Sequence, residues 1–154
     1  MALLDGAKSI LSSLVRIAPV ATTFSMTMCH LDQHFLFSSF RSPRTESALP
    51  STMKSYLDGI LPFVVSLEFT SYATLAANIW FTRSAWGWYA GGLLLSIVHL
   101  FNAPYAWKLL SRLQSEEEDS LDRQGTLRAF LRMNLLRILV TDVPLIVAVI
   151  VPLL

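Results

Sequence analysis

Charged residues are scarce in this chain. Asp, Glu, Lys and Arg make up only 15% of the 154 residues, whereas soluble domains contain roughly 25%. Hydrophobic residues account for 53%, and the mean hydropathy is +0.51. This composition argues against an ordinary soluble domain and predicts a membrane protein.

The chain also lacks several features that would point to other classes of protein. Its net charge is only +1 and no basic patch with interleaved aromatic residues occurs, so nucleic acid is not an expected partner. A single cysteine, Cys29, excludes an internal disulfide framework. The first residues have no basic region, apolar run and small-residue cleavage site together, so we interpret the first apolar segment as an uncleaved signal anchor.

Four long apolar segments follow one another along the chain. A membrane-spanning helix needs roughly 20 apolar residues, so four such helices and their loops use nearly the whole sequence. The sequence therefore predicts an all-α fold, a polytopic membrane four-helix bundle that forms a single transmembrane domain over residues 1–154. The expected spans are about 10–35, 59–81, 86–107 and 129–154.

Lys and Arg are unevenly divided between the expected loops. The first and third connections and their flanks hold eight of them, and the other side holds only Lys8 and Arg83. By the positive-inside rule the two long loops are cytoplasmic and both termini lie on the opposite side. The endoplasmic reticulum is the expected membrane. The eight basic residues are Arg41, Arg44, Lys54, Lys108, Arg112, Arg123, Arg128 and Arg132.

Each apolar segment contains an ionisable residue. Glu68 lies in a stretch with no other charge, and His30, His99, Arg137 and Asp142 interrupt the other three segments. An ionisable group is costly inside a bilayer, and such residues mark functional sites by default. The repeated pattern predicts a polar site within the membrane.

These residues also have similar predicted depths. With a rise of 1.5 Å per residue, Glu68 and His99 each lie about 12 Å from the cytoplasmic ends of their helices, and Arg137 lies about 13 Å from its own. Asn102 and Asn134 lie about one turn nearer the cytoplasm. We therefore expect one chamber in the cytoplasmic half of the bundle.

Structural and functional interpretations both remain open for the charged residues. Glu68 and Arg137 can form a charge pair that clasps two helices, because opposite partners reduce the cost of burial. Alternatively, Glu68 is a general base. His99 either bonds to a neighbouring helix or moves protons, since an imidazole titrates near neutral pH. Asp142 answers Arg16 or Arg137, just before a helix kink that we expect at Pro144.

A metal site is not expected, although two histidines have a suggestive spacing. His30 and His34 stand at i and i+4, on one face of a helix, which is a spacing found at metal sites. No Cys or Glu cluster completes such a site nearby, so an interfacial histidine pair is the preferred interpretation. No cofactor is predicted, and a haem bound through His99 or His30 is the alternative.

Two short motifs carry a resemblance to a known family. The third segment ends in Phe101-Asn-Ala-Pro104, and the fourth begins Phe130-Leu-Arg-Met-Asn-Leu-Leu-Arg137. This Asn-x-Pro exit and the later Asn-x-x-Arg resemble the small four-helix membrane family that includes the fungal anthrone oxygenases. Asn102, Pro104, Asn134 and Arg137 match the motif. Tyr105 and Ala106 stand where the family often has a second polar residue, and Phe130 replaces an aromatic Trp.

The resemblance implies tailoring of lipophilic natural products. Anthrone oxygenases add oxygen to activated aromatic polyketides without an evident cofactor motif, and relatives carry out other transformations, including cyclisation. On this basis the expected partners are a lipophilic small molecule, membrane lipid and further copies of the chain. The expected catalytic residues are Glu68, His99 and Arg137, and the expected substrate-binding residues are His30, Tyr72, Asn102, Trp107 and Asn134.

Several functions remain to be distinguished. Oxygenation of a polyketide or terpenoid by a monooxygenase-like enzyme is the leading hypothesis. A redox-neutral cyclase or pericyclase of the same family would give an isomer of its substrate instead. In a non-catalytic membrane subunit the polar residues would only hold helices together. A transporter is less well supported because the chain has no internal repeat.

Overall fold

The computed structural model describes residues 2–42, 44–116 and 119–154, and in these ranges all regular structure is helical, without a β-strand. The predicted all-α class is therefore confirmed. Short 3₁₀ turns lie at Ser39–Arg41, Glu46–Ala48, Arg83–Ala85 and Val151–Leu153. The α-helices are α1 (Ala2–Ser38), α2 (Leu49–Phe81), α3 (Trp86–Phe101), α4 (Ala103–Leu113), α5 (Ser120–Arg137) and α6 (Val143–Ile150).

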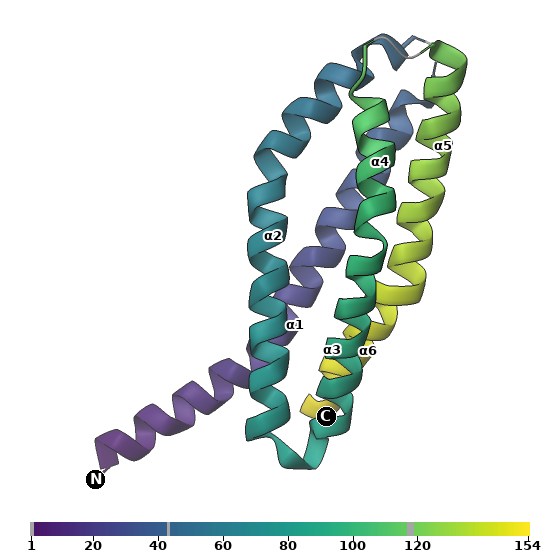
Figure 1. Ribbon diagram of the computed structural model, residues 1–154. Coiled ribbons are helices and arrows are strands. Elements are labelled where there is room, and N and C mark those ends of the chain that lie inside the picture. Colours follow the sequence, from purple (N-terminus) through teal and green to yellow (C-terminus); the bar gives the residue numbers. More distant parts are fainter. Residues whose placement is uncertain (1, 43, 117–118) are drawn as a thin grey trace.

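The helices run up and down beside one another (Figure 1). The α1–α2 and α4–α5 connections lie at one end, which we call the loop end. The short α2–α3 turn and both termini lie at the opposite end, the turn end, and the first part of α1 diverges there from the other helices. The predicted relative placement of termini and loops therefore agrees with the fold.

Among the described residues, three helical segments are long and apolar enough to cross a membrane: Ile10–Arg41, Glu46–Phe81 and Leu121–Leu153. A fourth is added if α3 and α4, which are bent by 41°, form one broken span. Many large apolar side chains on these helices are exposed, including Phe24, Phe69 and Leu139, as expected for helices that face lipid. Membrane insertion as a four-helix bundle stays a prediction.

The helices at the loop end are longer than the apolar segments indicated. Helix α2 begins at Leu49 rather than at residue 59, and helical turns occupy much of the expected connector 108–128. Hydropathy marks only the part of a helix suited to lipid, whereas the apolar face of an amphipathic helix can continue beyond it. Within the acidic run 116–119, Glu117 and Glu118 lie outside the described residues.

The expected third helix is not continuous. Asn102 ends α3, and its backbone N–H donates to the carbonyl of His99 at 3.1 Å. Pro104 occupies the first turn of α4, where its missing N–H removes one helical hydrogen bond and favours a break. The span predicted at 86–107 is therefore bent at Asn102, and it stays a prediction that α3 and α4 cross the membrane as one broken span.

The fourth span is also irregular, as the proline predicted. The segment Ile138–Asp142 is π-helical, and the N–H of Val143 donates to the carbonyl of Ile138, five residues earlier. Pro144 follows at the start of α6 and cannot donate a backbone hydrogen bond. Wide helical turns of this kind change the direction of the side chains that they carry and are frequent at functional sites.

Two apolar clusters lie at different heights along the bundle. The larger belongs to the loop end and includes Phe37, Leu57 and Phe130, whereas Leu75, Tyr89, Leu145 and Val149 form a smaller one toward the turn end. In the smaller cluster a Cβ built on Gly92 would lie 3.2 Å from Leu145 and 3.3 Å from Leu75. Gly92 thus permits close helix packing, whereas the same construction on Gly91 meets open space.

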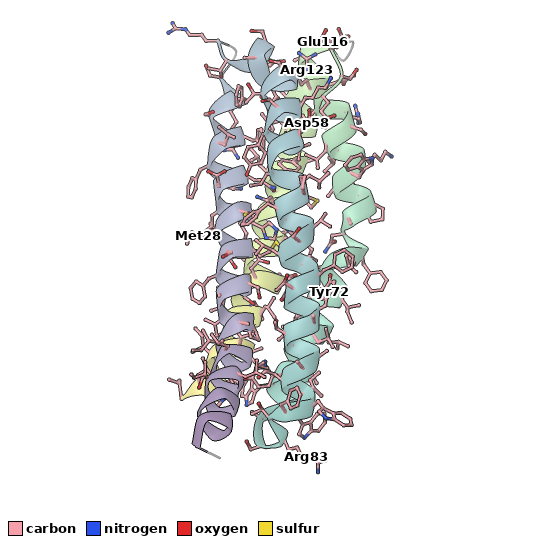
Figure 2. The ribbon with its side chains drawn as sticks, turned by 90° about the vertical axis from the view of Figure 1, so that its left-hand side faces the viewer. Met28, Asp58, Tyr72, Arg83, Glu116 and Arg123 are labelled. Atoms are coloured by element: carbon pink, nitrogen blue, oxygen red, sulfur yellow. The ribbon has the colours of Figure 1, made fainter. Side chains whose placement is uncertain are left out.

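The residues between these clusters are polar. Along α1, α2, α3 and the last span, His30, Glu68, His99 and Asp142 each lie between a residue of one cluster and a residue of the other. Figure 2 shows Tyr72, one turn from Glu68, between Asp58 and the Arg83 turn. Glu116 and Arg123 lie at the far loop end in the same view. The fold therefore places a polar layer between two apolar ones.

Candidate functional site

A buried pair of His30 and Asp142 forms the centre of the polar layer. Nδ1 of His30 lies 2.6 Å from Oδ2 of Asp142, and the two residues are 1% and 2% exposed. When Asp142 is ionised its carboxylate can only accept, and the ring nitrogen then donates in this bond. Among the described residues, Asp142 forms no ion pair with Arg16 or Arg137. Arg16 donates instead to the carbonyl of Pro152 at 3.2 Å.

The imidazole of His99 stacks on that of His30. The ring centroids are 5.1 Å apart and the ring planes differ by 18°. Helix α3 therefore brings His99 against His30 of α1. His30 is also held by its bond to Asp142, which lies in the π-helical segment. The contact of His99 with α1 is a stacked ring, and among the described residues it is not the hydrogen bond to a neighbouring helix that the sequence suggested.

Asn134 holds α1 and α5 together. Its Nδ2 donates to the backbone carbonyl of His30 at 2.7 Å, and its Oδ1 accepts a hydrogen bond from Nη2 of Arg137. Arg137 also donates to Oε1 of Gln33 at 3.3 Å. Because the Asn134 side chain is fully buried and both ends of its amide are occupied, its place in the fold is to position His30 and Arg137. Contact with substrate, as the sequence suggested, does not fit this geometry.

Glu68 is bonded within its own helix. Its carboxylate accepts a hydrogen bond from the hydroxyl of Tyr72, which also lies 3.3 Å from the carbonyl oxygen of Ser96. In the part of the chain that the structure describes, no ion pair joins Glu68 to Arg137. The predicted clasp between these two residues is therefore absent there, and the pair of His30 and Asp142 takes its place.

A small polar chamber of about 10 Å³ lies beside Glu68. Glu68 and His99 both line it, so the predicted meeting of the α2 carboxylate and the α3 imidazole occurs. The hydroxyls of Thr23, Ser71 and Ser96 also belong to its wall, and among the described residues none of the three has a hydrogen-bond partner. A chamber of this size, lined by several polar groups, suits one water molecule.

On the other side of His99 lies a larger pocket of about 180 Å³. Five of the predicted site residues line it: His30, His99, Asn102, Trp107 and Arg137. Glu68, Tyr72 and Asn134 are not among its lining residues. The remainder of the wall is mostly apolar: Gln33, Leu57, Ile60, Leu61, Val64, Ala103, Ala106, Leu110 and Phe130.

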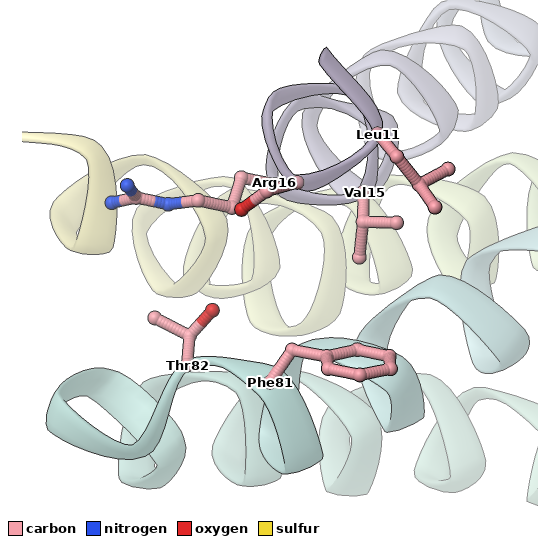
Figure 3. A pocket seen from close by; sticks show the side chains of 6 residues that line it. Leu11, Val15, Arg16, Phe81 and Thr82 are labelled. Atoms are coloured by element: carbon pink, nitrogen blue, oxygen red, sulfur yellow. The ribbon is translucent and has the colours of Figure 1, made fainter. Parts of the chain in front are cut away.

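Other hollows lie on the surface of the described residues. An open groove of about 760 Å³ runs between the α3–α4 break and α5, and it shares Asn102 and Arg137 with the pocket. A separate cavity of about 330 Å³ lies at the turn end, between α1 and the end of α2 (Figure 3). Its single charged side chain is Arg16, which Figure 3 shows turned away from Leu11 and toward the C-terminal segment. This cavity is remote from the polar layer.

Sequence reasoning missed the importance of Asp142. The residue was recognised as a polar interruption, but its partner is 112 positions away in the chain, and helix spacing within one segment cannot reveal such a pair. The three chamber hydroxyls gave no signal, because Ser and Thr are common in apolar helices. In the described ranges no group of three or more His, Cys, Asp or Glu residues is arranged to hold a metal ion.

The chain is distantly similar to proteins of fungal biosynthesis. It is 27% identical over 151 residues to the "Probable epoxidase scpX" of Mollisia scopiformis, covering 85% of this chain and 88% of that protein. It is also 27% identical over 157 residues to the "Oxaleimides biosynthesis cluster protein N" of Penicillium oxalicum, covering 92% and 89%. No family model matches the chain, and no solved structure matches it. These similarities place the chain beside proteins of fungal secondary metabolism.

Proposed function

We propose that this protein is a membrane-embedded tailoring enzyme of natural-product biosynthesis that oxygenates a lipophilic polyketide or terpenoid. Both relatives cover nearly the whole chain, and their names place one in a biosynthetic cluster and call the other a probable epoxidase. The resemblance of the Asn-x-Pro and Asn-x-x-Arg motifs to anthrone oxygenases points in the same direction. The exact oxidation is part of the proposal.

One observation carries the proposal: His30, His99 and Arg137, from three different helices, line one largely apolar pocket. A greasy substrate can occupy the apolar part of such a pocket while a few polar groups orient it. Scattered polar residues that served only to hold helices together would not need to share a cavity. The arrangement therefore supports chemistry on a hydrophobic molecule.

In the proposed mechanism His99 removes an acidic proton from the substrate. Its imidazole lines both the pocket and the chamber, so it can take a proton on the substrate side and release one toward Glu68. Arg137 lines the pocket as a fixed positive charge and stabilises the substrate anion. The electron-rich anion then reacts with dioxygen. When an activated methylene is converted to a carbonyl, one dioxygen yields the new carbonyl and one water, so no external reductant is needed.

Glu68 takes a supporting role in this scheme. It lies in the chamber rather than in the pocket, hydrogen-bonded to Tyr72. A water held by the hydroxyls of Thr23, Ser71 and Ser96 would connect its carboxylate to the His99 ring. We therefore assign Glu68 as the proton acceptor behind His99, and Asp142 as the residue that fixes the orientation of His30.

The proposed setting is the endoplasmic reticulum membrane, with both long loops in the cytoplasm and both termini on the opposite side. The pocket lies on the loop-end side of the polar layer, next to the break at Asn102. A lipophilic substrate would then enter from the cytoplasmic half of the bilayer. No nucleic acid is a partner in this proposal, and association with further copies of the chain is compatible with it.

The mechanism requires no metal or haem. A haem bound through His99 or His30 is the alternative, and the visible absorption spectrum of the purified protein distinguishes the two. A Soret band would show bound haem and refute the mechanism above. The spectrum without such a band, measured on protein that turns over substrate, would support it.

The experiment that tests the function uses membranes from a heterologous host that expresses the chain, supplied with an anthrone and with an alkene-containing polyketide. Mass spectrometry separates the candidate reactions. A gain of one oxygen with loss of two hydrogens marks methylene oxidation, a gain of one oxygen alone marks epoxidation or hydroxylation, and an isomer marks a cyclase. Conversion of none of the precursors by folded protein would favour a non-catalytic subunit.

Variants then assign the roles. We expect His99→Gln to lower turnover by about 10²–10⁴-fold, the usual contribution of a general base. His34→Gln is the matched control, because His34 is a histidine of α1, one turn from His30, that lines neither the pocket nor the chamber. If His99→Gln and Glu68→Gln both turn over normally while the proteins remain folded, the acid–base assignment is wrong.

A further inference from the structure

The groove beside the α3–α4 break has an amphipathic wall. Its volume is about 760 Å³. Arg128 and Arg132 lie toward the loop end of α5, whereas Leu136 follows at greater depth on α5 and Val140 lies in the π-helical segment after it. From Arg128 to Val140 the helix advances by roughly 18 Å. The full lining is Val98, Asn102, Tyr105, Arg128, Ala129, Arg132, Met133, Leu136, Arg137, Val140 and Thr141.

The two outer arginines form a pair. Arg128 and Arg132 stand at i and i+4, which places their side chains on one face of α5. Both residues are exposed, and within the described ranges neither guanidinium has a hydrogen-bond or ion-pair partner. Two adjacent guanidinium groups at the mouth of an apolar groove are suited to a carboxylate, whose oxygens match their planar fork.

The groove adjoins the candidate pocket. Asn102 and Arg137 line both hollows, so a molecule in the groove lies directly beside the pocket. The pocket alone, at about 180 Å³, is smaller than the roughly 300–1,000 Å³ usual for ligand sites. A substrate of ordinary size must therefore extend beyond it, and the groove is the adjoining space.

We propose that this groove binds a lipophilic organic acid. Its carboxylate lies on Arg128 and Arg132, and its apolar chain runs along Val98, Leu136 and Val140 toward Arg137. The proposal names the substrate class of the function proposed above and rests on that function for its biological meaning. The binding itself does not depend on any reaction. A free acid, rather than a phospholipid, is the proposed occupant because the groove shares Asn102 and Arg137 with the pocket in which the substrate would react.

The test measures equilibrium binding of radiolabelled dodecanoate to the full chain in neutral maltoside micelles, with binding to empty micelles subtracted. Dodecanol serves as the neutral ligand of the same chain length. We expect Arg128→Gln/Arg132→Gln to weaken dodecanoate binding about tenfold, which corresponds to two exposed charge contacts. Binding of dodecanol should change little, and each single substitution should have a smaller effect than the pair.

The matched control is Arg41→Gln/Arg44→Gln. These two arginines are also exposed at the loop end but line neither the groove nor the pocket. Equal weakening by both double variants would show general surface attraction and overturn the proposal, as would unchanged dodecanoate binding in Arg128→Gln/Arg132→Gln. Displacement of dodecanoate by phosphatidylglycerol, but not by phosphatidylcholine, would assign the groove to an anionic lipid headgroup and overturn it too.

The result is separable from that of the function. If membranes convert no precursor but dodecanoate binds through Arg128 and Arg132, the enzymatic proposal fails and the groove proposal stands. If precursors are oxygenated normally by Arg128→Gln/Arg132→Gln and dodecanoate binding is unaffected, the reverse holds.

Discussion

The buried contact of His30 with Asp142 predicts an unequal cost for removing either partner. In Asp142→Ala the Nδ1–H of His30 loses its acceptor in the interior, which costs about 1–3 kcal/mol of unfolding free energy. In His30→Ala a carboxylate is left buried without its partner, and breaking a buried pair in this way costs about 3–5 kcal/mol. In Asp142→Asn the amide oxygen can still accept from Nδ1, so the loss should be smallest. The side chains of His30 and Asp142 are only 1% and 3% exposed, so solvent provides no replacement.

The measurement is reversible unfolding in mixed micelles, followed by far-UV circular dichroism. The double variant His30→Ala/Asp142→Ala completes a thermodynamic cycle, and we expect a coupling energy of about 1.5–3 kcal/mol, the usual value for a hydrogen bond to a charged group. The matched control is the exposed contact in which the Tyr56 hydroxyl donates to Asp32 at 2.9 Å. Tyr56→Phe, which keeps the ring that packs against Phe37, and Asp32→Ala should each change stability by less than about 0.5 kcal/mol.

The order of the three variants is the sharper part of this prediction. A coupling energy near zero, or a larger loss in Asp142→Asn than in His30→Ala, would refute the inference that this pair organises the polar layer.

Three other substitutions, the first with Gly91→Leu as its matched control, test the packing around the site. Gly92→Leu should destabilise the protein by about 1–3 kcal/mol, because its side chain enters a filled contact between helices, whereas Gly91→Leu meets open space and should stay within about 0.5 kcal/mol in the same unfolding assay. Asn134→Leu should cost about 1–3 kcal/mol by leaving buried polar partners unsatisfied, and turnover should fall with it; normal turnover would contradict its positioning role. Pro144→Ala restores a backbone donor, so the π-helical turn should revert toward α-helix and the measured coupling of His30 with Asp142 should decrease. An unchanged coupling energy would show that Pro144 does not set the direction of that side chain.

The sequence by itself determined the helical class and which residues interrupt the apolar segments. Apolar runs of this length have few alternatives to helix, because a helix satisfies its own backbone hydrogen bonds. Counting residues along each helix also gave comparable depths for Glu68 and His99, and both line the same chamber. Depth along a helix depends only on the number of residues from its end, so it can be counted from the sequence.

Tertiary structure decided which polar groups meet. Residues on a helix point in directions that change with every step, so two groups at one depth can face each other or face lipid, and packing settles the choice. Asp142 reaches His30 through the π-helical turn before Pro144, whereas Glu68 bonds to Tyr72 and Arg137 to Asn134. These pairings depend on the rotation of each helix about its own axis. That rotation is fixed by contacts between distant segments, such as Gly92 against Leu145, and not by the pattern of any one segment.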